Sequence, residues 1–546
     1  MSSQSRKIHW TRFTTAIQFR DVFTIPTNLP DDPVLLQQML RAALAEIERQ
    51  RLIIAALQRN RFGRRSEKLG EAAVQLGIED LEQSVAEQAA LLEAAASPAI
   101  SPQQNGSARA PRTEPVKRNR GALPADLPRV EQVIDVEDKA CPCCGGQLHP
   151  IGEDTAEMLD YVPAHLRVRV IRRPRYGCRS CAEGVVQAPA PDRPIDGGMA
   201  TEALLAHVLV SKYCDSLPLY RQSEIFARQG IKLDRSALCN WVGRACWWLA
   251  PMHELLLSTV LTSPVLFADD TTLPVLDPGR GRTKTGRLWC YAIDPRPWNG
   301  PGHPAAAYVY SEDRKGVHPA SHLQDFAGVI QVDGYQGFGA VLQGEHGDTR
   351  ELAYCFAHAR RKFYDLYVSD ASPIAGEALQ RIAALYKIES EIRGTSEAHR
   401  RSVRQQRSRP LLEEMHEWLV RQLARISGSS DLAKAIRYSL THWTGLTRFL
   451  DDGRLDMDTN AVERAIKPIV ITRKNSLFAG SDSGGRHWSI AASLIQSARL
   501  NDVDPLAWLT DVLTRIVTGQ TKQNDLATLL PWNWKDAKTA EASDSS

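Results

Sequence analysis

Long hydrophobic runs are absent from this chain. No apolar stretch approaches the roughly 18 residues that a membrane-spanning helix requires. The opening residues, MSSQSRKIHWTRFTTAIQF, include basic and aromatic side chains but no compact apolar core or small-residue cleavage site, which argues against a signal peptide. We therefore expect a protein with no membrane association.

A large excess of charge of one sign is absent as well. The net charge is +3 over 546 residues, so any nucleic-acid binding must come from local basic patches. Apolar residues make up 43% and charged residues 24%, which is ordinary for globular protein. The chain is too long for a single compact core, so several domains are expected.

Cysteines are present but do not suggest a disulfide framework. Of the ten, four fall into two CxxC pairs and the others are scattered singly, which suits a reducing cytoplasm. Four thiolates can hold one structural Zn²⁺ in a closed tetrahedral site. Cys143 competes with Cys144, but only Cys144 gives the CxxC spacing. The alternative is a redox pair or idle surface thiols. The predicted zinc ligands are Cys141, Cys144, Cys178 and Cys181.

The N-terminal part has a helical heptad pattern followed by a polar linker. From Pro33 the apolar positions alternate four and three apart, which predicts a zipper-like helix of about three repeats. A single amphipathic helix packed on its own protein explains the spacing nearly as well. The following text, SPAISPQQNGSARAPRTEPVKRNRG, is typical of a disordered basic linker.

Residues 217–249 resemble a helix-turn-helix. LPLYRQSEIFARQG predicts the first helix, and DRSALCNWVGRACWWL the second, with Asp234 or Ser236 as its cap. Leu238 and Trp241 belong to the apolar face of the second helix. Ser236, Asn240 and Arg244 lie on the other face, where they could contact DNA in a major groove. An ordinary helical hairpin is the alternative.

Three acidic residues that are far apart in the sequence are candidate catalytic groups. Asp269 lies in the predicted strand LFADDTTLPVL, Asp333 follows the strand GVIQV, and Glu463 lies in the helix DTNAVERAIKP. Each alone has a structural explanation: an exposed strand end, an Asp-Gly turn, or an i,i+4 pair with Lys467. Their order matches a ribonuclease-H-like fold, which brings two strand aspartates and one helical glutamate together. Oxygen ligands favour Mg²⁺ or Mn²⁺.

Basic residues accompany the predicted carboxylate site. Arg473 and Lys474 follow the Glu463 helix, and Arg360 and Arg361 lie in HARRKF. We expect these four side chains to contact DNA phosphates, with surface solvation as the alternative. His358, flanked by apolar residues, could join the site but is the kind of histidine that is more often structural.

Longer motifs give a specific resemblance. They run in order from FGRRSEK through the cysteine pairs, SKYCDSLPLYRQ, ADDTTLPVLDPGRGRTKTGRLW, VDGYQGF, CFAHARRKF, LYKIE, DTNAVERAIKP and RKNSLFAGSDSGG. The chain from about Pro33 to Trp534 resembles the large transposase of the insertion sequence 66 family. In the family, the first aspartate is usually followed by Glu-Thr, whereas this chain has Asp270-Thr271. Asp269 keeps the register of the motif, but Asp270 remains an alternative.

The resemblance implies a multidomain protein with an α/β ribonuclease-H-like catalytic domain interrupted by a helical insertion. It also implies an N-terminal coiled-coil helix, a zinc-binding module and a helix-turn-helix. The implied catalytic acids are Asp269, Asp333 and Glu463, which would hold two Mg²⁺ or Mn²⁺ ions per active site. The expected divisions are an extension (1–32), zipper-like region (33–95), linker (96–126), zinc module (127–190), helix-turn-helix (198–257), catalytic domain (258–500, insertion about 366–450) and C-terminal helix with a loose tail (501–546).

The activity implied by this resemblance is DNA transposition: binding the element's terminal repeats, freeing 3′-hydroxyls and joining them to target DNA. The expected partners are DNA, further copies of the chain and small accessory proteins from the same element. Two alternatives remain open. One is a non-catalytic zinc and helix-turn-helix regulator of DNA, and the other is a nuclease on the same fold that cuts without joining.

Overall fold

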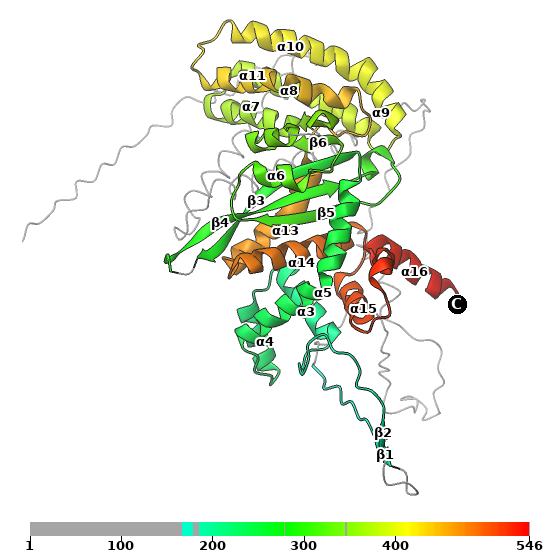
Figure 1. Cartoon of the computed structure of the whole chain (residues 1–546). Helices are drawn as coiled ribbons and strands as arrows, with labels where there is room; N and C mark the ends of the chain where they lie inside the picture. Colours follow the sequence, from blue (N-terminus) through cyan, green and yellow to red (C-terminus); the bar gives the residue numbers. More distant parts are fainter. Residues whose placement is uncertain (1–165, 178–184, 278, 344–346, 545–546) are drawn as a thin grey trace, which may run out of the picture.

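The computed structural model describes residues 166–177, 185–277, 279–343 and 347–544 (Figure 1). The predicted zipper-like helix, the linker and all four predicted zinc ligands lie outside these residues. Within them, no helix is long and apolar enough to cross a membrane.

A mixed five-stranded sheet forms the centre of the molecule. Its strand order is β5-β4-β3-β6-β7. The pairs β3–β4 and β4–β5 are antiparallel, whereas β3–β6 and β6–β7 are parallel. Because helices cover the sheet, the central strands are buried almost continuously. The strands are β3 (Val265–Asp277), β4 (Arg282–Ile293), β5 (Ala305–Ser311), β6 (Gly328–Val332) and β7 (Arg350–Tyr354).

Strands β3 and β6 agree with the strands predicted around Asp269 and before Asp333, but β7 was not predicted. Its sequence, RELAY, lacks β-branched residues. The strand forms because it pairs in parallel with β6. The buried Arg350 also fixes it in place by donating hydrogen bonds to the carbonyls of Phe326 and Val341, at 2.8 and 2.9 Å.

Helices cover the sheet on both faces. Below it in Figure 1 lie α3 (Glu202–Tyr213), α4 (Leu219–Arg228) and α5 (Arg235–Leu261). On the same side, α13 (Asn460–Ser476) packs on β3 and β4, and α14 (Asp482–Leu500) packs mainly on β5. The short α6 (Val317–His322) lies on the other face, where the His322 ring contacts Trp289 of β4.

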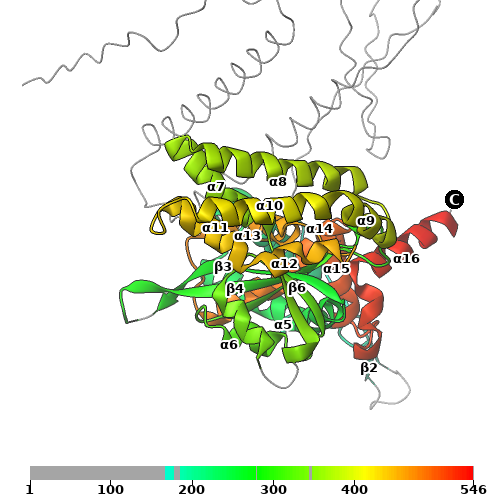
Figure 2. The ribbon, with the colours of Figure 1, turned by 90° about the horizontal axis from the view of Figure 1, so that it is seen from above.

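A helical region follows β7 and forms the upper part of the molecule in Figure 1 (Figure 2 shows it from above). It has its own apolar core, built around Phe363, Ile382 and Trp418. A helical insertion was predicted at about residues 366–450, and the structure confirms that this region is helical. The elements are α7 (Phe356–Asp370), α8 (Pro373–Ile392), α9 (Glu397–Val403), a π-helical turn η4 (Arg404–Ser408), α10 (Arg409–Leu423), α11 (Asp431–Thr441), α12 (Trp443–Thr447) and η5 (Arg448–Leu450).

The predicted faces of the second helix of the helix-turn-helix are confirmed. In α5, Leu238 and Trp241 are buried, whereas Ser236, Asn240 and Arg244 are exposed. Asp234 occupies the N-cap position, although its side chain makes no capping hydrogen bond. The helix continues to Leu261, past Pro251, and packs against α14.

The alternation in HLRVRVIRRPRYGC makes strands plausible, and its described residues contain β1 (Arg175–Gly177), which pairs with β2 (Val185–Gln187). One other expectation was wrong. The residues after α15 (Pro505–Val517) were expected to be a loose tail. They form η6 (Gln523–Leu529) and α16 (Pro531–Asp544). Tryptophan is the reason, because Trp532 is buried and Trp534 Nε1 donates to Asp511 at 2.7 Å.

Candidate active site

Asp269 and Asp270 are adjacent in β3, so the pleat of the strand directs their side chains to opposite faces of the sheet. The side chain of Asp270 is fully buried and pairs with Arg287 at 2.9 Å and Arg314 at 2.8 Å. Among the residues that the structure describes, no lysine or arginine forms an ion pair with Asp269. Asp270 is therefore neutralised by protein charges, and Asp269 is left with an uncompensated carboxylate.

Asp333 lies beside Asp269 because of the register of the two parallel strands. Val265 pairs with Val329 and Phe267 with Gln331, and continuing this register by two residues brings Asp333 next to Asp269. Asp333 Oδ1 accepts a hydrogen bond from the backbone N–H of Tyr335 at 2.8 Å, which shapes the turn after β6.

The turn at Asp333 is also clamped by the helical region. Gly334 has a φ of +98°, which favours glycine, and a Cβ there would lie 2.5 Å from the Tyr438 hydroxyl. That hydroxyl donates to the Asp333 carbonyl at 3.0 Å. The position of Asp333 therefore depends on α11 as well as on β6.

Glu463 lies in the first turn of α13, which is anchored to the sheet along its length. The Tyr308 hydroxyl of β5 donates to the Ala465 carbonyl at 2.6 Å. Near the other end, Arg473 Nη1 donates to Thr271 Oγ1 at 3.2 Å and also contacts Thr272. The Glu463 side chain is only 16% exposed, so it is not a solvated surface acid.

The three acids are partly buried and share a negatively charged environment. Burial raises the pKa of Asp269 well above its ordinary value, and the charge of Asp333 is the next cause. Asp270 and Glu463 add to this repulsion. Burial also raises the pKa of Glu463, partly opposed by His358. Among the described residues, no lysine or arginine forms an ion pair with Asp269 or Asp333 to offset this repulsion. The arrangement therefore fits a site for divalent metal ions.

A cysteine and a histidine complete the cluster on the side of Glu463. His358 Nδ1 lies 3.9 Å from Glu463 Oε1. Burial lowers the pKa of His358, but Cys355, Glu463 and Asp333 together raise it to about 10. Cys355 was not predicted as a site residue. The signal that could have found it is the spacing C-x-x-H in CFAHARRKF, which puts both side chains at the start of α7.

The loop that leads into α13 is held in place from two directions. Gln331 of β6 donates to the Asp456 carbonyl at 2.7 Å, and its own side-chain oxygen accepts from the Asp456 N–H at 3.0 Å. From the helical region, Arg400 pairs with the Asp456 carboxylate at 2.7 Å, and Arg404 donates to the Leu455 carbonyl at 2.9 Å. These contacts fix where the helix of Glu463 begins.

The predicted DNA-contact residues have different environments. Lys474 is exposed at the end of α13, whereas Arg473 binds the threonines of β3. Arg360 and Arg361 lie in α7, two and three residues after His358, and are half-buried. Ser236, Asn240 and Arg244 are exposed on α5, separate from the carboxylates. Their DNA contacts stay a prediction.

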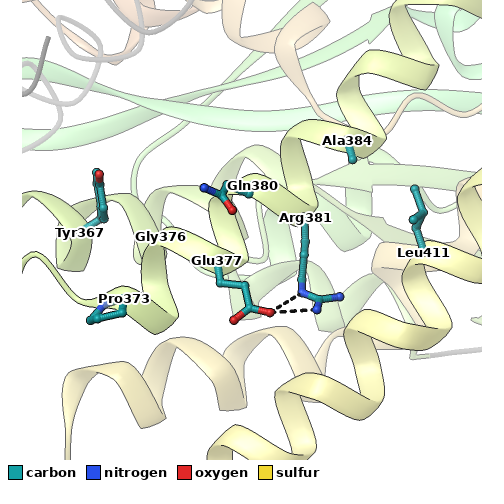
Figure 3. Close-up of a pocket in the computed structure, with 8 residues that line it drawn as sticks. All are labelled: Tyr367, Pro373, Gly376, Glu377, Gln380, Arg381, Ala384 and Leu411. Carbon is teal, nitrogen blue, oxygen red and sulfur yellow. Dashed lines mark hydrogen bonds and ion pairs between the residues drawn. The ribbon is translucent and has the colours of Figure 1, made fainter. Parts of the chain in front are cut away.

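A shallow groove of about 660 Å³ lies in the helical region, away from the three acids. Figure 3 shows its lining, including Tyr367 of α7, Leu411 of α10 and the ion pair between Glu377 and Arg381 of α8. That pair closes at 2.9 Å. None of the predicted site residues lines this groove.

Comparison with known sequences identifies the family. The profile described as Transposase IS66 family matches residues 197–487, which include all three acids. The chain belongs to this family. Further profiles match residues 138–182 (zinc-finger binding domain of transposase IS66), 493–532 (IS66 C-terminal element) and 49–131 (Transposase C of IS166 homeodomain).

Similar proteins occur in Sinorhizobium fredii (strain NBRC 101917 / NGR234). Uncharacterized protein y4jD is 50% identical over 428 residues, covering 78% of this chain and 84% of that protein. Uncharacterized protein y4qI is 41% identical over 544 residues, covering 93% and 98% respectively.

The matched IS66 domains indicate that the protein is a transposase with DNA as its partner. Its catalytic profile implies the use of divalent metal ions, and its zinc-finger profile suggests zinc binding.

Proposed function

We propose that this IS66-family transposase binds the ends of its insertion element, cleaves them to free 3′-hydroxyls and joins these to target DNA. The observation that carries the proposal is the set of three partly buried carboxylates, Asp269, Asp333 and Glu463, whose mutual repulsion is not offset by ion pairs with lysine or arginine among the described residues. Phosphoryl transfer by carboxylate-held metal ions needs such a site.

We further infer a ribonuclease-H-like catalytic domain. Three antiparallel strands come first in the chain, the first of them is central, and two parallel strands then extend the sheet on its other side. The helical region after β7 then separates the strands from α13, as expected for an insertion between the second aspartate and the glutamate.

In this proposal the three acids together would hold two Mg²⁺ or Mn²⁺ ions. When bound, the ions would supply Lewis-acid activation of the scissile phosphate and of the attacking oxygen. The protein's own contribution is rigid placement: β3 and β6 hold the two aspartates in register, and Tyr308 and Gln331 fix α13 and its entry loop. Arg287 and Arg314 neutralise Asp270, which selects Asp269 as the ligand of the pair.

Contacts to DNA are assigned to two surfaces. Exposed Ser236, Asn240 and Arg244 on α5 suit recognition of the element ends, with base edges and phosphates as their targets. Lys474, with Arg360 and Arg361, suits phosphate contacts near the carboxylates. A structural Zn²⁺ on Cys141, Cys144, Cys178 and Cys181 would stabilise the zinc-binding module, which precedes both surfaces in the sequence.

The test is a strand-transfer assay with the full-length chain, labelled DNA of both element ends, a target plasmid and Mg²⁺. Asp333→Asn should reduce transfer at least about 100-fold, the size of effect that losing one electrostatic group at a reaction centre can have. Binding to the ends should not change. The matched control is Asp325→Asn, an exposed aspartate in the loop before β6, which should transfer like the unmodified protein.

The outcomes separate the alternative functions. End binding without cleavage by the unmodified protein in Mg²⁺ or Mn²⁺ would indicate a regulator. Cleavage without joining would indicate a nuclease. Undiminished transfer by Asp333→Asn would refute the assignment of this residue.

A further inference from the structure

Cys355, His358 and Glu463 bring three different metal-binding groups together. The sulfur, one ring nitrogen and one carboxylate oxygen all lie within 4.8 Å of one another. Cys355 precedes α7, His358 lies in its first turn, and Glu463 comes from α13. The cluster therefore joins two helices that are far apart in the sequence.

The environments of Cys355 and His358 favour metal coordination over contact with solvent. Cys355 is completely buried, and its sulfur accepts a hydrogen bond from the Thr459 N–H at 3.2 Å. His358 Nδ1 is buried and has no hydrogen-bond partner among the described residues. A buried polar atom left without a partner destabilises the folded state. A metal ion between these groups would remove that destabilisation.

The donor set favours a metal other than magnesium. Sulfur and imidazole are ligands for zinc and similar ions, whereas magnesium prefers oxygen. In a tetrahedral zinc site, two nitrogen or oxygen ligands lie roughly 3.3–3.4 Å apart, and a sulfur lies about 3.5–3.6 Å from such a ligand, as follows from the usual bond lengths. The distance between His358 Nδ1 and Glu463 Oε1 is 3.9 Å, and no pair of ligand atoms in the cluster is more than 4.8 Å apart. Contraction of the cluster around an ion would complete three protein ligands, with water as the fourth.

We infer that Cys355, His358 and Glu463 form an inhibitory site for a thiophilic divalent cation such as Zn²⁺. Binding would form one bond from each residue and release two protons to solvent, the thiol proton of Cys355 and the proton of the coordinating His358 nitrogen. Glu463 cannot serve this tetrahedral site and the octahedral magnesium pair equally well. Zinc therefore withdraws this carboxylate from catalysis. Only the inhibitory consequence rests on the proposed function; the binding does not.

The binding test counts zinc in the full-length chain after equilibration with micromolar Zn²⁺ and removal of free metal. The unmodified protein should retain one zinc more than Cys355→Ser. The matched control is Cys246→Ser, another fully buried free cysteine, which should retain as much as the unmodified protein. Co²⁺ provides a second readout, because the Cys355→Ser variant should lose part of the sulfur-to-cobalt charge-transfer absorption. Equal zinc contents in the unmodified protein and Cys355→Ser would overturn the inference.

His358→Gln covers the case in which Cys355→Ser does not fold. This side chain is 21% exposed, so the substitution is less disruptive, and it should also lose one zinc. If His358→Gln keeps the full zinc content, the site does not exist.

The inhibition test measures how much Zn²⁺ inhibits Mg²⁺-dependent strand transfer. It compares the unmodified protein, Cys246→Ser and the residual activity of Cys355→Ser. Half-inhibition should require at least about 10-fold more zinc for Cys355→Ser, a typical cost of damaging a metal site. Equal sensitivity would reject the inhibitory role. A protein that never transfers DNA but still loses one zinc in Cys355→Ser would reject the proposed function and leave the metal site standing.

Discussion

Arg404 provides the sharpest test of how the helical region positions Glu463. Its guanidinium has no exposed surface and pairs with Glu389 at 2.6 Å. It also donates to the carbonyls of Phe449, Asp452 and Leu455 at 2.9, 3.1 and 2.9 Å. These carbonyls belong to the end of the helical region and to the loop that enters α13. Replacing Arg404 with Met keeps much of its volume and removes every one of these contacts.

The expected loss of stability follows from burial. Breaking a buried ion pair by removing one partner costs about 3–5 kcal/mol, because the remaining charge is left uncompensated. Here Glu389 would be that charge, with its side chain 12% exposed, but Arg400 at 3.5 Å still compensates it in part. The Leu455 carbonyl also keeps a weaker hydrogen bond from Arg400 at 3.3 Å. We therefore expect a destabilisation of about 3 kcal/mol for Arg404→Met, the lower end of this range.

Two measurements check this value and its location. Denaturant unfolding gives the loss of stability, and hydrogen exchange of the peptide 451–463 reports on the loop before Glu463. Exchange there should accelerate in Arg404→Met, and strand transfer should fall with it. Arg407→Met is the matched control, because Arg407 forms a surface ion pair with Glu391 whose side chains are 48% and 43% exposed. Such pairs contribute little. If both variants behave alike, the helical region does not position Glu463 through Arg404.

Three further predictions follow from the site and its surroundings. Asp269→Asn should abolish strand transfer without weakening the fold, whereas Asp270→Asn should lower the unfolding temperature because the buried Asp270 loses its ion pairs with two arginines; the reverse pattern would exchange their roles. Burial raises the pKa of Asp458 to about 6 from an ordinary 3.8. The folded state therefore holds this proton longer, so the Asp458 contribution to stability is present at low pH and is lost as pH rises from about 4 to 6. Asp458→Asn should raise stability at pH 7 by up to about 3 kcal/mol in denaturant unfolding, and an unchanged pH dependence would contradict this. Arg244→Ala should weaken end binding and reduce the slope of log affinity against log salt by about 1 in a titration; an unchanged slope would exclude a phosphate contact.

Patterns of local sequence were sufficient for much of the fold. Strands β3 and β6 and the two faces of α5 follow from apolar periodicity, since a face that is apolar at the right spacing has to be buried. The fifth strand, RELAY, has no such pattern and forms only because β6 provides a partner. Similarly, the helix of the C-terminal residues depends on Trp532 and Trp534 finding contacts elsewhere in the molecule.

The three acids could be selected as candidates from the sequence because of their order along the chain. The sequence favoured Asp269 over Asp270 only through the register of the family motif, because both are aspartates in one strand. The physical distinction depends on which face of β3 carries Arg287 and Arg314, and these come from other parts of the chain. Cys355 was missed for the same reason, since its C-x-x-H spacing acquires meaning only when α13 brings Glu463 to it.

The sequence by itself therefore determined the kinds of groups available, the elements that carry them and the family. The tertiary structure decided which carboxylates remain without a compensating charge and which side chains share a site. The physical reason is that helix and strand periodicity is a local property, whereas burial and electrostatic interaction depend on neighbours that only the folded chain supplies.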